Sequence, residues 1–195
     1  MTPQDVITTA RYILNDTSSS SPRQSDDELL GYVNEGVKTV QTLRPELFST
    51  VGDFLCQVGQ CEQSLVFASA TALIEVLSIH GGAAVTQFDL DAMNRFNPGW
   101  RTDAEGAAKQ WARFSNDQLK FFIYPKAPAD QTIDVRYVRT PAVFALADQI
   151  TDLPLGLQPA LVDFVVYRAE SKDNEHVLSQ RAAAALATFT AQVKG

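Results

Sequence analysis

The sequence predicts an α+β fold in which N- and C-terminal helices form one bundle and a β-rich segment is inserted between them. Apolar residues recur at helical spacing near both ends of the chain, whereas the middle holds short β-type runs separated by turn signals. Strands bracketed by helices favour α+β over a doubly wound sheet. We therefore expect helices in 1–46, a β-rich insertion in 47–140 and helices in 141–195.

The composition is typical of a globular protein that needs no metal or disulfide to fold. The 195 residues are 45% hydrophobic and 20% charged, with a net charge of −7. Acidic and basic residues are mixed and form no basic stripe, which argues against tight binding of nucleic acid through its phosphates. With no run of about 18 apolar residues and no charged-then-apolar leader, neither a membrane span nor a signal peptide is expected.

Two helices are predicted in the N-terminal part. Thr2 and Pro3 start the first, and the Ser-rich stretch 15–24 predicts a polar, mobile loop after it. Ser25 opens a second helix with an acidic first turn, which Pro45 ends. The apolar residues at helical spacing are Val6, Ile7, Ala10, Ile13 and Leu14, then Leu29, Leu30, Val33, Val37, Val40 and Leu43.

The middle of the chain predicts short strands. Apolar and polar residues alternate in 132–137, which is typical of a strand with one solvated face. Residues 89–96 begin with an aspartate and predict a short helix within this part.

The C-terminal part predicts two helices, at about 157–172 and 174–193. Apolar residues wrap most of the way round the first of them, namely Leu161, Val162, Phe164, Val165 and Val166. A surface helix normally has one apolar stripe, so we expect its own domain to cover one side and a second chain the other. The predicted interface places Leu161, Phe164 and Val165 toward one partner and Val162, Val166 and Ala169 toward another. The polar end of the helix adds Arg168 and Lys172.

No motif for catalysis or cofactor binding is present. The sequence lacks phosphate-binding, dinucleotide-binding, zincin and nucleophile-elbow motifs. Asp89 and Asp91 lack the glycine and glutamate of a calcium loop, and helix capping accounts for them. Cys56 and Cys61 are expected as free thiols on neighbouring strands, with a bridge left open. We therefore expect no enzyme, no cofactor and no bound metal.

The remaining polar candidates are interpreted structurally. His80 is expected in a hydrogen-bonded turn, and His176 on a solvated helix face. In the loop 94–101, Arg95, Trp100 and Arg101 predict an interface whose tryptophan anchors against a neighbour. The alternative for this loop is binding of an anion or a base by stacking.

Five segments, taken in order, resemble the head-to-tail adaptor (connector) proteins of tailed bacteriophages. They are TPQDVITTARYILND, SDDELLGYVNEG, VGQCEQSL, LDAMNRFNPGW and PALVDFVVYRAESKDNEHVLSQRAAAALATF, and the resemblance spans nearly the whole chain. It implies a non-enzymatic virion protein of the neck, assembled in the host cytoplasm. Such adaptors form a ring, commonly of twelve subunits, below the portal, where they extend the DNA channel and offer a docking platform.

The implied partners are copies of the same chain, the portal protein, and the next neck or tail protein, such as a nozzle or tail tube. Double-stranded DNA would pass through the channel without sequence-specific binding. An acidic channel repels DNA phosphates, and Asp26 and Asp27 are candidates for lining it. Three alternatives remain: a tail-completion or stopper protein, a small metal-dependent hydrolase or nuclease at Asp89 and Asp91, and an anion-binding module at Arg95 and Arg101.

Overall fold

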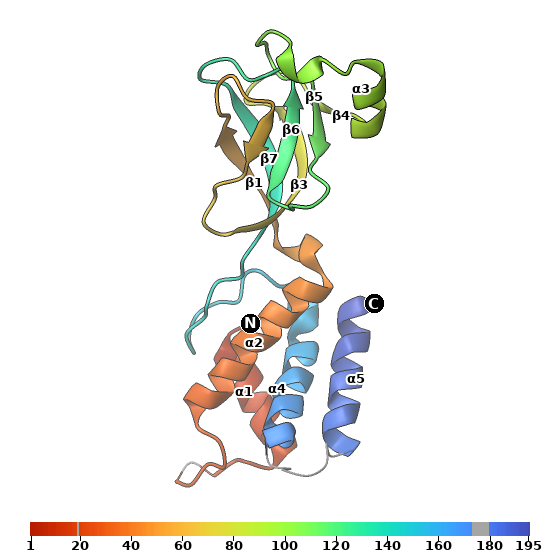
Figure 1. Ribbon diagram of the computed structural model, residues 1–195. Helices are drawn as coiled ribbons and strands as arrows, with labels where there is room; N and C mark the ends of the chain where they lie inside the picture. The colour runs from red at the N-terminus through yellow and green to blue at the C-terminus, as the bar shows by residue number, and fades with distance from the viewer. Residues whose placement is uncertain (19, 173–179) are drawn as a thin grey trace. The chain divides into compact units, whose positions relative to one another are not determined.

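The computed structural model describes residues 1–18, 20–172 and 180–195, and the chain forms two compact units. Met1–Phe48 and Pro141–Gly195 together make the helical unit, and Ser49–Thr140 makes the β unit. Terminal helices flanking a strand-rich middle confirm the α+β prediction (Figure 1). The predicted start of the last helix at 174 and His176 lie outside the described residues.

The described residues of the helical unit form four helices, with α4 in contact with the other three (Figure 1). The helices are α1 (Pro3–Leu14), α2 (Asp26–Leu43), α4 (Gln158–Lys172) and α5 (Gln180–Lys194). Two short 3₁₀ turns, η1 (Pro45–Phe48) and η3 (Leu155–Leu157), follow α2 and precede α4. None of these described helices has the length and apolar character needed for a membrane span.

The predicted helix starts are confirmed by their capping contacts. The Thr2 Oγ1 accepts a hydrogen bond from the Asp5 N–H at 3.2 Å, and the Asp5 carboxylate accepts one from the Thr2 N–H at 2.8 Å. This reciprocal capping box satisfies backbone donors that α1 leaves unpaired. The Ser25 Oγ likewise accepts from the Glu28 N–H at 3.2 Å. α2 ends at Leu43, two residues before Pro45, with Arg44 as its C-cap.

Arg11 organises the segment between α1 and α2. Its guanidinium contacts the Asp16 carboxylate at 2.5 Å, the Gln24 carbonyl oxygen at 2.8 Å and the Asp26 carboxylate at 2.8 Å. Asp16 is buried and also accepts from the Arg23 N–H at 2.8 Å. These bonds join the end of α1 to the start of α2.

Two sheets form the β unit. A three-stranded antiparallel sheet has the order β1 (Ser49–Leu55), β7 (Thr132–Arg139), β3 (Ala70–Ile79). A four-stranded sheet has the order β2 (Glu62–Ser64), β6 (Lys120–Tyr124), β5 (Gln110–Arg113), β4 (Thr86–Gln87). The helix α3 (Leu90–Phe96) and the 3₁₀ turn η2 (Trp100–Thr102) lie between β4 and β5 in the chain.

The core of the β unit contains side chains from both sheets. On β7, Ile133 and Val135 are buried whereas Asp134 between them is not, which confirms the predicted strand with one solvated face. The main cluster of buried residues joins Phe54, Cys56, Leu65, Leu73, Val76, Val85, Ala108, Trp111, Phe121, Ile123, Ala127, Ile133 and Val135. The opposite face of the β1–β7–β3 sheet carries Asp53 and Asp134, together with the exposed apolar side chains of Val51 and Leu55 on β1.

Candidate subunit interface

The five apolar α4 residues predicted at an interface are buried inside the helical unit. Their exposed fractions run from 0% to 4%, for Leu161, Val162, Phe164, Val165 and Val166. Ala169 is also buried. Helices α1, α2 and α5 of the same chain pack against α4, so one subunit covers it on both sides. Fully covered side chains such as Leu161 and Val165 could contact a second chain only if the helices separated, whereas Val162 also lines a groove described below.

Close packing fixes α4 between its neighbours. The Phe164 ring lies 5.0 Å from the Phe189 ring of α5, measured between centroids, at an interplanar angle of 60°. On the opposite side, Gly36 of α2 lets the helices approach, since a Cβ placed there would lie 3.0 Å from the Phe164 Cδ1. Both contacts leave little room for movement of α4 within the unit.

The cationic end of α4 is paired with α2. The Arg168 Nε lies 3.0 Å from a Glu35 carboxylate oxygen, and the Lys172 Nζ lies 2.5 Å from the Glu28 Oε1. The same Glu28 oxygen accepts from the Tyr32 hydroxyl at 2.8 Å. These bonds, first from Lys172 and then from Tyr32, lower the pKa of Glu28. Burial, together with Glu28, raises the pKa of Tyr32 to about 12. The predicted interface residues Arg168 and Lys172 thus form ion pairs with α2 of the same chain.

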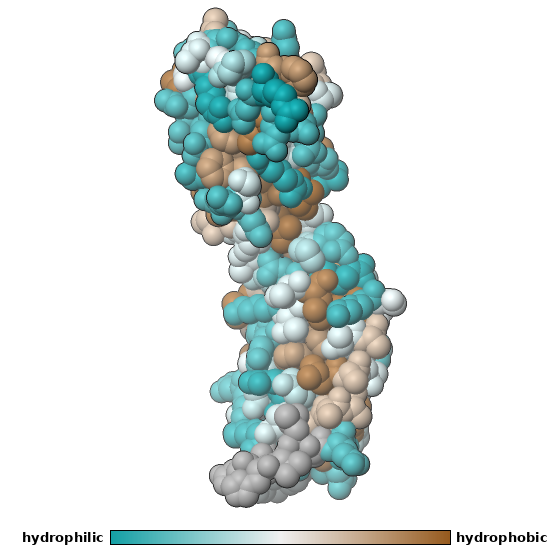
Figure 2. Space-filling view, turned by 45° about the vertical axis from the view of Figure 1, so that its right-hand side comes forward, coloured by the Kyte–Doolittle hydropathy of each residue, from teal (hydrophilic) through white to brown (hydrophobic). Residues whose placement is uncertain are grey.

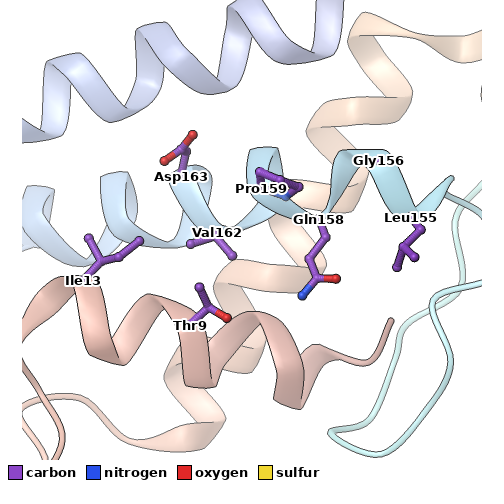
Figure 3. Close-up of a pocket in the computed structure, with 8 residues that line it drawn as sticks. All are labelled: Thr9, Ile13, Leu155, Gly156, Gln158, Pro159, Val162 and Asp163. Atoms are coloured by element: carbon purple, nitrogen blue, oxygen red, sulfur yellow. The ribbon is translucent and has the colours of Figure 1, made fainter.

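An apolar groove opens between α1 and the start of α4 (Figure 3). We call it the α1–α4 groove; its volume is about 430 Å³ and its lining residues are Thr9, Ile13, Leu155, Gly156, Gln158, Pro159, Val162 and Asp163. Within the lining, Ile13 is 43% exposed and Leu155 is 67% exposed. The Asp163 carboxylate is turned toward α5, where it accepts a hydrogen bond from Gln192 at 3.1 Å (Figure 3). Burial raises the pKa of Asp163, and this hydrogen bond lowers it to a smaller extent. The groove is a concave surface that no described part of the chain fills.

The outward side of α5 is a second apolar surface. We call it the outer α5 face, and its residues are Ala183, Leu186, Ala187, Thr190, Ala191 and Lys194. The opposite side of the helix is buried through Ala182, Phe189 and Val193. Hydrophobic residues also gather on the exposed surface of the helical unit in Figure 2. This surface is not evident from the sequence, because its residues are mostly small and look like an ordinary solvated helix side.

The loop between α3 and η2 is anchored within the β unit. Trp100 is fully buried, and its indole N–H donates to the Asn94 Oδ1 at 2.9 Å. The Arg101 guanidinium donates to the same oxygen at 2.9 Å and lies 4.3 Å from the Trp100 ring centroid. The prediction that Trp100 anchors against a neighbour is therefore corrected: it anchors its own loop. Arg95 and Phe96 remain exposed on α3.

Asp89, a candidate metal ligand, and Cys56 and Cys61, candidates for a disulfide bridge, have structural roles. The Asp89 carboxylate caps α3 by accepting from the Asp91 and Ala92 N–H groups at 2.8 and 3.1 Å. Cys56 and Cys61 are free and buried, so the bridge that the sequence left open is absent. Burial raises the pKa of Cys56 to about 11 and also raises that of Cys61, which disfavours reactive thiolates.

The predicted channel acids lie in the first turn of α2. Asp26 is exposed and paired with Arg11, and Asp27 is exposed. His80 contacts Asp134 and Asp53 across the strands. The pKa of His80 is raised, first by its hydrogen bond to Asp134 and then by Asp53.

Comparison with known proteins identifies a family over the full length of the chain. Curated proteins give no match. A chain of the structure titled "Virion of native gene transfer agent (GTA) particle" is 15% identical, with 97% of this chain and 91% of that chain covered, at a TM-score of 0.32. A chain of the structure titled "Neck of empty GTA particle computed with C6 symmetry" is 14% identical, with 88% of this chain and 79% of that chain covered, at a TM-score of 0.29. Scores this low carry no argument. The family model described as SU10 adaptor protein matches residues 1–195, in agreement with the resemblance to adaptor proteins, and the chain belongs to this family.

Proposed function

We propose that this chain is a non-enzymatic subunit of a head-to-tail adaptor ring in the neck of a virion. The observation that carries the proposal is the match of all 195 residues to the adaptor family. In this proposal the ring contains twelve subunits and lies below the portal. It extends the DNA channel and provides the surface on which the next neck or tail protein docks. The structural roles of Asp89, Cys56 and Cys61 support a function without catalysis.

The subunit contact joins two different surfaces of the helical unit. In this proposal the outer α5 face of one subunit docks in the α1–α4 groove of the next. A ring needs such a heterologous contact, in which each subunit uses both surfaces and the rotation closes. Both surfaces are mainly apolar, which favours burying one against the other.

The energy of one such contact is modest. Full burial of a leucine side chain stabilises by about 1.5–3 kcal/mol. Because Leu155 is 67% exposed, covering it contributes about 1–2 kcal/mol. Repetition of the same contact around a closed ring makes weak pairwise contacts sufficient for a stable assembly.

The other predicted residues take supporting roles in this proposal. The buried α4 residues, with Arg168 and Lys172, keep α4 rigid, so that the groove and the outer α5 face hold their positions. Arg95 and Arg101 are exposed and available to a partner protein on the β unit. Asp26 and Asp27 are exposed acids that would repel DNA phosphates if they line the channel.

Electron cryo-microscopy of virions that contain this chain tests the role. Density for the chain in a ring between portal and tail is expected, and necks without room for it would overturn the proposal. Mixing the purified protein with isolated portals and with tails separates an adaptor from a stopper or tail-completion protein. An adaptor binds the portal first, whereas binding to tails alone would favour the alternatives.

Charge substitutions test the contact separately. Leu155→Asp and Leu186→Asp should prevent ring formation, measured by sedimentation velocity, without changing the far-UV circular dichroism. The matched control is Val66→Asp, because Val66 is 74% exposed and belongs to the β unit. If both leucine variants form rings normally, this contact is wrong, but the proposed adaptor role is unaffected.

A further inference from the structure

Three side chains that can bind metal meet on the solvated face of the β1–β7–β3 sheet. Asp53 of β1 lies directly opposite Asp134 of β7 in the strand register. His80, which follows β3, places its Nδ1 2.8 Å from the Asp134 Oδ1 and 3.4 Å from the Asp53 Oδ1. Like charges directly opposite on neighbouring strands are destabilising, and a positive group between the two carboxylates relieves this, whether it is a protonated His80 or a metal ion.

Two of the three separations between these atoms are compatible with a coordination sphere. One ligand atom from each residue lies within 4.8 Å of the other two. At a metal–ligand distance of about 2.1 Å, adjacent ligand atoms lie about 3.0 Å apart in octahedral and about 3.4 Å apart in tetrahedral coordination. The 2.8 Å and 3.4 Å separations from the His80 Nδ1 fall close to these values. An ion could therefore bind with small side-chain movements.

We propose that Asp53, His80 and Asp134 form a binding site for a divalent first-row transition metal ion, with Zn²⁺ as the preferred ion. An imidazole nitrogen with two carboxylates suits Zn²⁺ or Mn²⁺ and disfavours Ca²⁺, which takes oxygen ligands. Three protein ligands leave at least one position open for water or for a group from a partner protein. The bound ion would cross-link all three strands of the sheet.

The neighbouring groups hold the ligands in place. The Ser78 hydroxyl donates to the Asp134 Oδ2 at 2.7 Å, which leaves the Oδ1 facing His80. The His80 N–H donates to the Thr132 carbonyl oxygen at 3.0 Å and ties the histidine backbone to β7. Such outer partners orient the ligands of metal sites, and their loss weakens binding about 10- to 100-fold.

Isothermal titration of the full chain with ZnCl₂, after treatment with a chelator, tests the site. One Zn²⁺ per chain is expected, with a rise in the melting temperature of the β unit followed by tryptophan fluorescence, since both tryptophans, Trp100 and Trp111, lie in it. A parallel titration with MnCl₂ should show weaker binding. No binding of either ion would overturn the proposal.

Variants locate the ion. His80→Asn and Asp134→Asn should abolish binding, and Ser78→Ala should weaken it about 10- to 100-fold. The control is His176→Gln, which changes the only other histidine and should bind normally. Because His80 is exposed at a turn, His80→Asn should fold normally. This variant therefore tests the site even if Asp134→Asn fails to fold. Unchanged Zn²⁺ affinity in His80→Asn would reject the site.

Discussion

Phe189 holds α5 against α4, and its replacement by alanine should destabilise the helical unit strongly. The side chain is fully buried, and its ring packs 5.0 Å from the Phe164 ring. A buried Phe→Ala change loses transfer free energy and leaves a cavity, at a cost of about 3–5 kcal/mol. Since whole domains are stable by only about 5–15 kcal/mol, Phe189→Ala should remove a large part of the stability of this unit.

Urea unfolding with two probes measures this cost. Far-UV circular dichroism follows mainly the helices, whereas tryptophan fluorescence reports on the β unit, which holds both Trp100 and Trp111. Phe189→Ala should move the dichroism transition to lower urea. The matched control is Phe96→Ala, which removes a ring that is 83% exposed and should change stability by no more than about 0.5 kcal/mol.

A small effect would refute the packing argument. If Phe189→Ala costs less than about 1 kcal/mol, or no more than Phe96→Ala, then α5 is not docked on α4 in solution. The outer α5 face would then have no fixed position, and the proposed ring contact would lose its structural basis.

Two further predictions concern buried polar groups. The Gln63 side chain accepts from the Gln57 N–H at 2.7 Å and donates to the carbonyl oxygens of Gln57 and Gln60 at 3.1 and 2.9 Å. Gln63→Leu leaves these groups unpaired and should cost about 1–3 kcal/mol in urea unfolding followed by fluorescence; unchanged stability would contradict this. Burial raises the folded-state pKa of Asp163 above its unfolded value, so the folded state binds the proton more tightly and gains relative stability as pH falls through that pKa. Asp163→Asn keeps an acceptor for Gln192 without the charge, and it should raise the melting temperature at neutral pH and by less at about pH 4; an equal change at both would contradict the assignment.

Local signals predicted the elements of this fold. The Thr2 and Ser25 caps, the aspartate start of α3 and the alternation in 132–137 each depend on neighbours within a few residues, and all of them are found in the structure. Helical periodicity also identified the apolar residues of α4. Periodicity shows how many sides of a helix are apolar, but not which molecule covers them. Helices of the same chain pack against α4, and contact of α4 with a second chain stays a prediction.

The surfaces and the metal-type cluster depend on contacts between distant segments. Asp53 and Asp134 meet only because β1 and β7 pair in one register, and a shift of one residue would turn one carboxylate to the other face. His80 joins them from the end of β3. No motif or residue spacing in the sequence indicates that these three side chains lie close together. The α1–α4 groove likewise combines residues from the two ends of the chain, among them Ile13 and Leu155.

Cross-linking of mixed single-cysteine variants tests the proposed ring contact most directly. Leu155→Cys places a thiol in the α1–α4 groove, and Ala187→Cys places one on the outer α5 face. The native cysteines are buried and should react slowly with a short bifunctional maleimide under native conditions. In rings assembled from both variants, cross-links should join one variant to the other, and rings of either variant alone should give few. Efficient cross-links within a single variant, or none in the mixture, would contradict the contact between the outer α5 face and the groove.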